Sequence, residues 1–319
     1  MARYIRNTLV LFKVESTPGT DATPTGAADA VLVSDLSINP LDANNIDRGL
    51  VRPYFGASEQ LVGVANIKCS VTVELAGSGT AGTAPQWGDL LLGCAMAEAV
   101  LASPARVEYA PVSTALKTGT LYWYDDGVLH KAFGVMGNAK LMAKVGDRPK
   151  LSFDFVGVDG GISAASTTGT FTNWKTPPTM QKANVVDIIL GGSYAAGAIT
   201  GGTGYKSTGL ELDLGNAVQF VPTLSYESVD IVDRSVTGKV QLDLTAAEEV
   251  AMMAIVKANT TQSLALQIGA VAGNKVIAYA GKVQLINPTK EELNGRRLIG
   301  YQLRLVPNAG NDELLLVTQ

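Results

Sequence analysis

The sequence predicts a mainly β protein built from two similar units. Apolar and polar residues alternate with period two over residues 61–75, turn residues are frequent (34 glycines in 319 residues), and the order of elements in the first half recurs in the second. Apolar residues make up 46% of the chain and charged residues 17%, which allows a sizeable core and argues against extensive disorder. We therefore expect two tandem β-sandwich or barrel domains, each with one short helix.

The first unit is predicted over residues 30–160. Its strongest strand is LVGVANIKCSVTVEL (61–75), with apolar side chains on one face and mostly polar ones on the other, as in a half-buried antiparallel strand. The next segment, QWGDLLLGCAMAEAV (86–100), carries apolar residues at helical spacing and predicts a short buried helix. Further strand patterns follow, with an Asp-Gly turn at 126–127 and a Gly-Asp turn at 146–147.

The second unit is predicted over residues 183–319. The stretch SVTGKVQLDL (235–244) alternates in the same way, and TAAEEVAMMAIVKAN (245–259) predicts a buried helix that opens with a capping box from Thr245 to Glu248. The order strand, helix, strand, long strand, strand thus occurs twice. Because identity between the halves is slight, the agreement lies in pattern and order.

Three segments lack a core pattern. Residues 1–29 predict an N-terminal assembly arm. Within it STPGTDATPTGAAD (16–29) is rich in turn residues, and we expect this stretch to have no core partner in its own chain. Residues 161–182 are rich in Gly, Ser, Thr and Pro and predict a linker. Residues 41–60 predict a long loop that mixes charges with apolar residues. Long loops inside compact domains are usually functional, and apolar residues on one need a partner surface.

No catalytic, metal or cofactor site is predicted. The only histidine, His130, has no second ligand at metal-site spacing, and Cys69 and Cys94 are too few for a cysteine zinc site. The stretch GGTGYKST (201–208) resembles a phosphate-binding loop, but Tyr205 separates the last Gly from Lys and a strand pattern follows. The prediction there is a flexible loop.

The charge balance also limits the partners. The formal net charge is −4, and no block of Lys and Arg is long enough to predict tight phosphate binding. The N-terminal apolar run TLVLF is too short for a signal peptide, and no stretch approaches the ~18 apolar residues of a membrane span. We expect a soluble protein from a reducing compartment, with no membrane partner.

Residues Glu15–Thr25, Ala30–Gly56 and Val71–Glu98 resemble the major tail tube proteins of long-tailed, siphovirus-type bacteriophages. The resemblance implies tail-tube-like β domains with a flanking helix, and a structural virion protein rather than an enzyme. It implies that the inner sheets join into rings, which stack into a tube, the conduit for DNA ejection. Arms and long loops of such proteins bridge rings.

The resemblance further implies that this protein's main partner is itself. Two tube-like domains per chain favour a ring of three chains with pseudo-sixfold symmetry; a true hexamer with the second domain outside is the alternative. Tape-measure and tail terminator proteins are expected partners, DNA passes through without specific binding, and no cofactor is expected. The expected location is the virion tail, after assembly in the host bacterial cytoplasm. The subunit-interface candidates are Tyr4, Phe12, Pro24, Arg48, Leu50, Arg52, Tyr54 and Phe55.

Two other classes compete with this hypothesis. A β-sandwich binding or decoration module of the virion, for receptor or carbohydrate, predicts exposed aromatic loops; only NWKTPP and LYWYD offer aromatics, and the latter is a predicted strand. A hydrolase is disfavoured because one histidine serves the whole chain.

Overall fold

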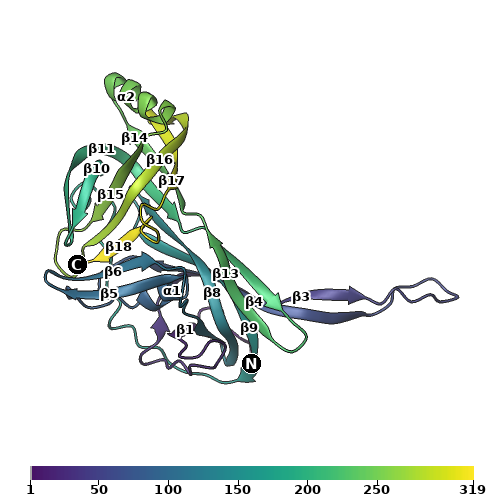
Figure 1. The fold of residues 1–319 in the computed structure, drawn as a ribbon. Helices are drawn as coiled ribbons and strands as arrows, with labels where there is room; N and C mark the ends of the chain where they lie inside the picture. Colours follow the sequence, from purple (N-terminus) through teal and green to yellow (C-terminus); the bar gives the residue numbers. More distant parts are fainter. Residues whose placement is uncertain (1) are drawn as a thin grey trace.

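The computed structural model describes residues 2–319 and is mainly β, as the sequence predicts (Figure 1). The first half contains β1 (Thr8–Val14), β2 (Ala30–Val31), β3 (Val33–Asp47), β4 (Gln60–Glu74), α1 (Gly88–Leu92), β5 (Met96–Ala102), β6 (Ala105–Pro111), β7 (Gly119–Asp125), β8 (Val128–Lys144) and β9 (Lys150–Ala164). The second half contains β10 (Ile188–Ala195), β11 (Ala198–Asp213), β12 (Asn216–Pro222), β13 (Glu227–Arg234), β14 (Thr237–Asp243), α2 (Ala246–Lys257), β15 (Thr261–Ile268), β16 (Val276–Leu293), β17 (Arg296–Leu305) and β18 (Leu315–Thr318).

The two halves have the same strand order. In the first, neighbours run β3-β4-β9-β8-β7-β1, and β2, which only Leu32 separates from β3, returns to pair with β1. In the second, neighbours run β11-β14-β17-β16-β15-β10, and β10 pairs with β11. Each half is therefore an antiparallel six-stranded barrel, and α1 and α2 occupy the same place in the two chain orders.

The two barrels also share irregularities in their ladders. The β3·β4 ladder shifts register at 33–35 and the β11·β14 ladder at 207–209, the equivalent place. The β7·β8 ladder shifts at 119–121 and the β15·β16 ladder at 262–264, again equivalently. Because a β-bulge occupies a defined position and bends its strand there, two coincident bulges mark the same local architecture in both halves.

One sheet and one core run through both halves. Lys140–Lys144 of β8 pairs with Gly209–Asp213 of β11, which yields the continuous strand order β3-β4-β9-β8-β11-β14-β17-β16. A second connection runs through β18, which pairs with β16 and with β6. The main hydrophobic cluster includes Phe153 of the first half and Tyr301 of the second. The halves are thus two barrels fused along one sheet.

The N-terminal segment differs from the expected arm. β1 lies in the first barrel, and beyond it the carboxylate of Glu15 accepts hydrogen bonds from the amides of Gly19 and Gly134 at 2.7 and 2.9 Å. Further along, Asp21 accepts a hydrogen bond from the Tyr122 hydroxyl, and Pro24 is buried. The interpretation that residues 16–29 have no partner in their own chain is therefore wrong. Polar contacts, rather than an apolar stripe, bind this segment to the barrel.

The two helices differ in burial. α1 is buried as predicted, and the indole of the preceding Trp87 donates to the carbonyl of Ala76 at 2.8 Å. In α2 the predicted capping box is present, but Met252 is the only buried residue, so the expectation of a buried helix is wrong. α2 projects from the end of the second barrel (Figure 1). Its side chains are apolar on several faces, which does not specify an inward one.

Replacing Thr245 with alanine is expected to lower the free energy of unfolding by about 1 kcal/mol. The side chain of Thr245 accepts from the amide of Glu248 while the Glu248 carboxylate accepts from the amide of Thr245, so the change frees donors at the N-terminus of α2. Urea unfolding followed by circular dichroism measures the effect. Thr172→Ala, at an exposed turn position, is the control; equal losses in the two variants would contradict the assignment.

Two hairpins occupy equivalent positions but have different surroundings. The outer part of β3 and β4 extends far from the body, with the connection 48–59 at its end (Figure 1). Of the predicted loop 41–60, residues 41–47 and 60 belong to β3 and β4, and residues 48–59 form the connection. The equivalent excursion of the second half is the separate hairpin β12–β13, which lies against β8 and β9 of the first barrel. One hairpin is thus packed within the chain, and the other is not.

Candidate assembly surfaces

The first candidate surface is the tip of the projecting hairpin, residues 48–59. Val51 and Phe55 are fully exposed, and Leu50 and Tyr54 are 44% and 66% exposed. Several large apolar side chains so close together on one exposed loop make the tip a candidate interaction surface. Of the predicted interface residues, Leu50, Tyr54 and Phe55 of the tip are thus accessible to another molecule. The N-terminal Tyr4, which is 65% exposed, is accessible as well.

Arg48 and Arg52 of the tip are paired within the chain. Both guanidinium groups contact the carboxylate of Glu59, that of Arg52 at 3.5 Å. All three side chains are about one-third exposed or more. Exposed ion pairs contribute roughly 0–1 kcal/mol. These contacts therefore connect the two sides of the tip and contribute little to its stability.

Tyr4 lies in a short N-terminal segment that is attached to the turn between β7 and β8. Arg3 forms an ion pair with Asp125, and the amide of Tyr4 donates to Asp126 at 2.6 Å. The Asn7 amide side chain also donates to Asp126, and these hydrogen bonds lower the pKa of the Asp126 carboxyl. The backbone is thus held, while Tyr4 remains exposed.

Phe12 and Pro24 are placed differently from the prediction, because both are buried within the chain. The ring of Phe12 stacks on that of Phe155 with centroids 5.3 Å apart. Phe12 also fills the space over Gly119, where an added Cβ would lie 2.2 Å from its ring. Neither side chain can contact another subunit while the barrel is folded, so neither is an interface residue.

Two open strand edges, one at each end of the sheet, are further candidate surfaces that the sequence did not reveal. Within the described residues, 35–39 of β3 pair with β4 alone, and 289–293 of β16 pair with β17 alone. The two edges lie at opposite ends of the eight-stranded order. Unpaired backbone donors and acceptors along a strand edge are a template for pairing with another chain. The sequence shows strands here but not which of their edges stay open.

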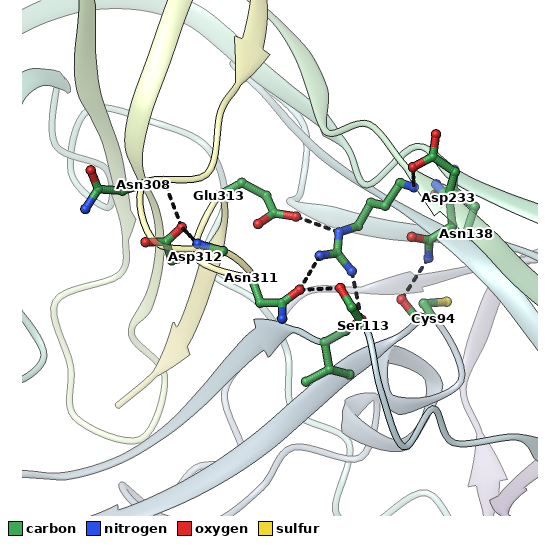
Figure 2. A network of polar contacts seen from close by, with 12 residues as sticks. Cys94, Ser113, Asn138, Asp233, Asn308, Asn311, Asp312 and Glu313 are labelled. Atoms are coloured by element: carbon green, nitrogen blue, oxygen red, sulfur yellow. Dashed lines mark hydrogen bonds and ion pairs between the residues drawn. The ribbon is translucent and has the colours of Figure 1, made fainter.

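A polar network fastens the in-chain joint between the barrels (Figure 2). The guanidinium of Arg234 contacts Glu313 at 2.6 Å and donates to the carbonyl of Val112 and the side chain of Asn311, both at 2.9 Å. Asn311 also contacts the hydroxyl of Ser113 at 2.6 Å. Arg234 and Glu313 are only 10% and 8% exposed. This buried pair links β13, the C-terminal segment and the first barrel.

A second part of the joint is built on Asn216. Its buried side chain donates to the carbonyls of Cys94 and Gly137 at 2.8 and 3.0 Å, and its backbone amide donates to the side-chain oxygen of Asn138. Asn138 in turn donates to Asp213 at 2.7 Å. These bonds fix the base of the packed hairpin β12–β13 on the first barrel, directly beside the β8·β11 ladder.

The sequence positions considered for a metal or phosphate site, His130 and residues 201–208, lie within strands of the two barrels. His130 stacks on Trp123 with centroids 4.2 Å apart, and burial lowers the pKa of its imidazole. Residues 201–208 lie within β11, so the expectation of a flexible loop there is wrong. Among residues 2–319 no group of three or more His, Cys, Asp or Glu side chains is placed to hold a metal ion. None of the described helices is long and apolar enough to span a membrane.

Comparison with known proteins gives one family. The model of the phage tail tube protein family matches residues 5–305, nearly the whole chain. No curated protein matches the sequence. The match covers both barrels and the connection between them, and it places the protein in the virion tail as a structural component. The chain belongs to the phage tail tube protein family.

Proposed function

We propose that three copies of this chain form a ring with pseudo-sixfold symmetry, and that the rings stack into the tube of a siphovirus-type tail. The observation that carries the proposal is the presence of two equivalent barrels in one chain, matched in strand order and in the positions of two bulges. Repeated units that join head to tail generate a ring when the rotation closes. Three chains supply six such units.

The alternative hexamer would place the second barrel outside the ring. The continuous sheet and the shared core argue for the trimer, because the second barrel extends the same sheet through β8·β11 rather than forming a separate appended module. In the trimer both barrels have the same relation to the ring axis. The two open edges then face neighbouring chains.

The charges of the sheet suit a conduit for DNA. On the face of the eight-stranded sheet opposite the core, Lys140 lies 3.3 Å from Asp154 and 3.7 Å from Asp213. Nearer the hairpin, Lys68 contacts Asp42 at 2.5 Å. Cations that are already neutralised hold phosphates weakly, whereas clustered free cations bind DNA tightly. We propose that this face lines the tube and that DNA slides past it.

The proposed stacking contacts are the tip, residues 48–59, and the exposed N-terminal Tyr4. A tip with exposed Val51, Tyr54 and Phe55 at the end of a long hairpin can reach a neighbouring ring. We further propose that tape-measure and tail terminator proteins bind the ends and interior of the tube, and that assembly takes place in the host bacterial cytoplasm. The match to the tail tube family, which places the protein in the virion tail, supports this part of the proposal.

Electron microscopy of the purified chain, with rotational averaging of ring views, tests the proposal. We expect rings or tubes whose end views have threefold symmetry with six similar lobes. Strict sixfold symmetry would instead favour the hexamer. A protein that stays monomeric at high concentration, even after purified tail-tip complex is added, would contradict self-assembly.

A triple substitution, Val51→Ser, Tyr54→Ser and Phe55→Ser, is expected to abolish tubes while leaving rings intact. The change removes the apolar surface of the tip, which makes no contact with either barrel's core, so folding is retained. Tube length in micrographs is the measurement, and Val271→Ser, another exposed apolar position, is the control. Long tubes from the triple variant would show that stacking uses other surfaces. Deleting residues 1–25 is a poorer test because it removes β1 from the first barrel.

A further inference from the structure

We propose that neighbouring chains join in the way that the two halves of one chain join, with β3 of one chain pairing along β16 of the next. This inference rests on the proposed ring and specifies its joint. The partner is a second copy of this chain. The in-chain β8·β11 ladder is the template, and each of its two strands has an equivalent strand in the other barrel.

The strand equivalent to β11 is β3. In the second barrel Leu210 lies opposite Val240 of β14, and in the first Leu36 lies opposite Val71 of β4. The coincident bulges fix this match residue by residue. Residues 35–39 of β3 therefore correspond to 209–213 of β11, the segment that pairs with β8. In the first barrel the corresponding edge has no partner within the described residues.

The strand equivalent to β8 is β16. Leu141 of β8 lies opposite Leu151 of β9, and Lys290 of β16 lies opposite Ile299 of β17. Matched through these partners, residues 289–293 of β16 correspond to 140–144 of β8. The outer edge of residues 289–293 is the second open strand edge. Both strands of the β8·β11 template therefore have an equivalent, β16 and β3, whose edge lacks a partner within the described residues.

The exposure of the apolar side chains agrees with a missing partner on β3. Leu210 and Leu212, which β8 covers, are 1% and 2% exposed. Their equivalents, Leu36 and Ile38, are only half-buried. Pairing of the two edges would cover these side chains as β8 covers Leu210 and Leu212.

The template also gives the register between chains. Transferring the β8·β11 pairs predicts an antiparallel ladder in which residues 35, 36, 37, 38 and 39 of one chain lie opposite 293, 292, 291, 290 and 289 of the next. Ser37 then faces Glu291 on the solvent side, as Glu211 faces Met142 within the chain. Since a shift by one residue would reverse the faces, the register is open to a direct test.

The joint between chains is more polar than its template. Leu141 and Ala143 of β8 are buried, whereas their equivalents Lys290 and Glu292 are exposed, and Lys290 forms an ion pair with Glu249 of α2. Backbone hydrogen bonds and the aliphatic part of Lys290 must therefore supply most of the contact. This difference is reasonable for chains that fold separately before they join.

Disulfide trapping tests the register. A chain carrying Ser37→Cys and Glu291→Cys, oxidised with diamide after assembly, is expected to yield covalently linked dimers and trimers on non-reducing gels. Glu211→Cys with Met142→Cys is the matched control, since the same geometry lies within one chain and the mass stays that of a monomer. Ser37→Cys with Lys290→Cys places the thiols on opposite faces and is expected to lose the cross-link. Native Cys69 and Cys94 are buried, which raises the pKa of Cys69 to about 12 and that of Cys94 as well, so they react slowly.

Hydrogen exchange on the unmodified protein gives a second, independent measurement. Amides of 35–39 and 289–293 are expected to exchange about tenfold or more slowly in rings than in monomers, while those of 209–213 are protected in both. Rings that form without the cross-link and without this protection would overturn the inference alone. A protein that forms no rings at all would overturn the proposed function and the inference with it.

Discussion

The variant Arg234→Met is expected to lose about 3–5 kcal/mol in the free energy of unfolding. Arg234 and Glu313 form a buried ion pair, and Arg234 also donates to the carbonyl of Val112 and the side chain of Asn311. Methionine fills a similar volume but leaves the carboxylate of Glu313 buried and unpaired. The cost comes mainly from that stranded charge rather than from the lost attraction.

Urea unfolding of the dilute, monomeric protein measures this loss. The matched control is Arg296→Met, because Arg296 contacts Asp243 at 2.6 Å but is 71% exposed. That exposed pair is expected to contribute less than about 1 kcal/mol. Similar losses in the two variants would show that the Arg234 pair does not fasten the barrels. The double variant Arg234→Met with Glu313→Leu is expected to recover much of the stability, since it removes both charges.

The variant Glu15→Ala is expected to lose roughly 2–6 kcal/mol. The Glu15 side chain is buried and accepts hydrogen bonds from the amides of Gly19 and Gly134 and from the hydroxyls of Thr118 and Thr120. The hydroxyls can rotate to new partners, but the two amides cannot. Each stranded amide costs about 1–3 kcal/mol.

Thermal or urea unfolding again provides the measurement for Glu15→Ala. Glu227→Ala, at an exposed position on β13, is the control and is expected to change stability little. Limited proteolysis adds a local readout, because residues 16–29 should become the first site of cleavage when their anchor is lost. A Glu15→Ala protein as stable as the control, with residues 16–29 still resistant, would show that the buried carboxylate does not hold this segment.

The sequence was sufficient for the fold class and for the repeat. Period-two alternation in residues 61–75 and 235–244 marks equivalent strands, which the structure places as β4 and β14. The capping box at Thr245 also marks the start of a helix correctly. These features are local, so each can be seen in a short window of residues.

The sequence failed where contacts are distant or polar. Residues 16–29 show no apolar pattern, yet Glu15 and Asp21 bind to positions roughly a hundred residues later, such as Thr118 and Tyr122. α2 is apolar on several faces, so its composition suggested burial that the structure does not show. The open edges of β3 and β16 depend on which strands pair, and no short window of sequence contains that information.

The fusion of the two barrels through β8·β11 has a kinetic consequence. In a ring of three such chains, half of the six joints form during folding and are independent of protein concentration. Only the other three must be found by diffusion, because linking two modules makes one of their contacts intramolecular. Nucleation of a ring then requires an encounter of three bodies rather than six. Its rate should depend on a lower power of chain concentration, so rings can begin to form while the protein is still scarce in the infected cell.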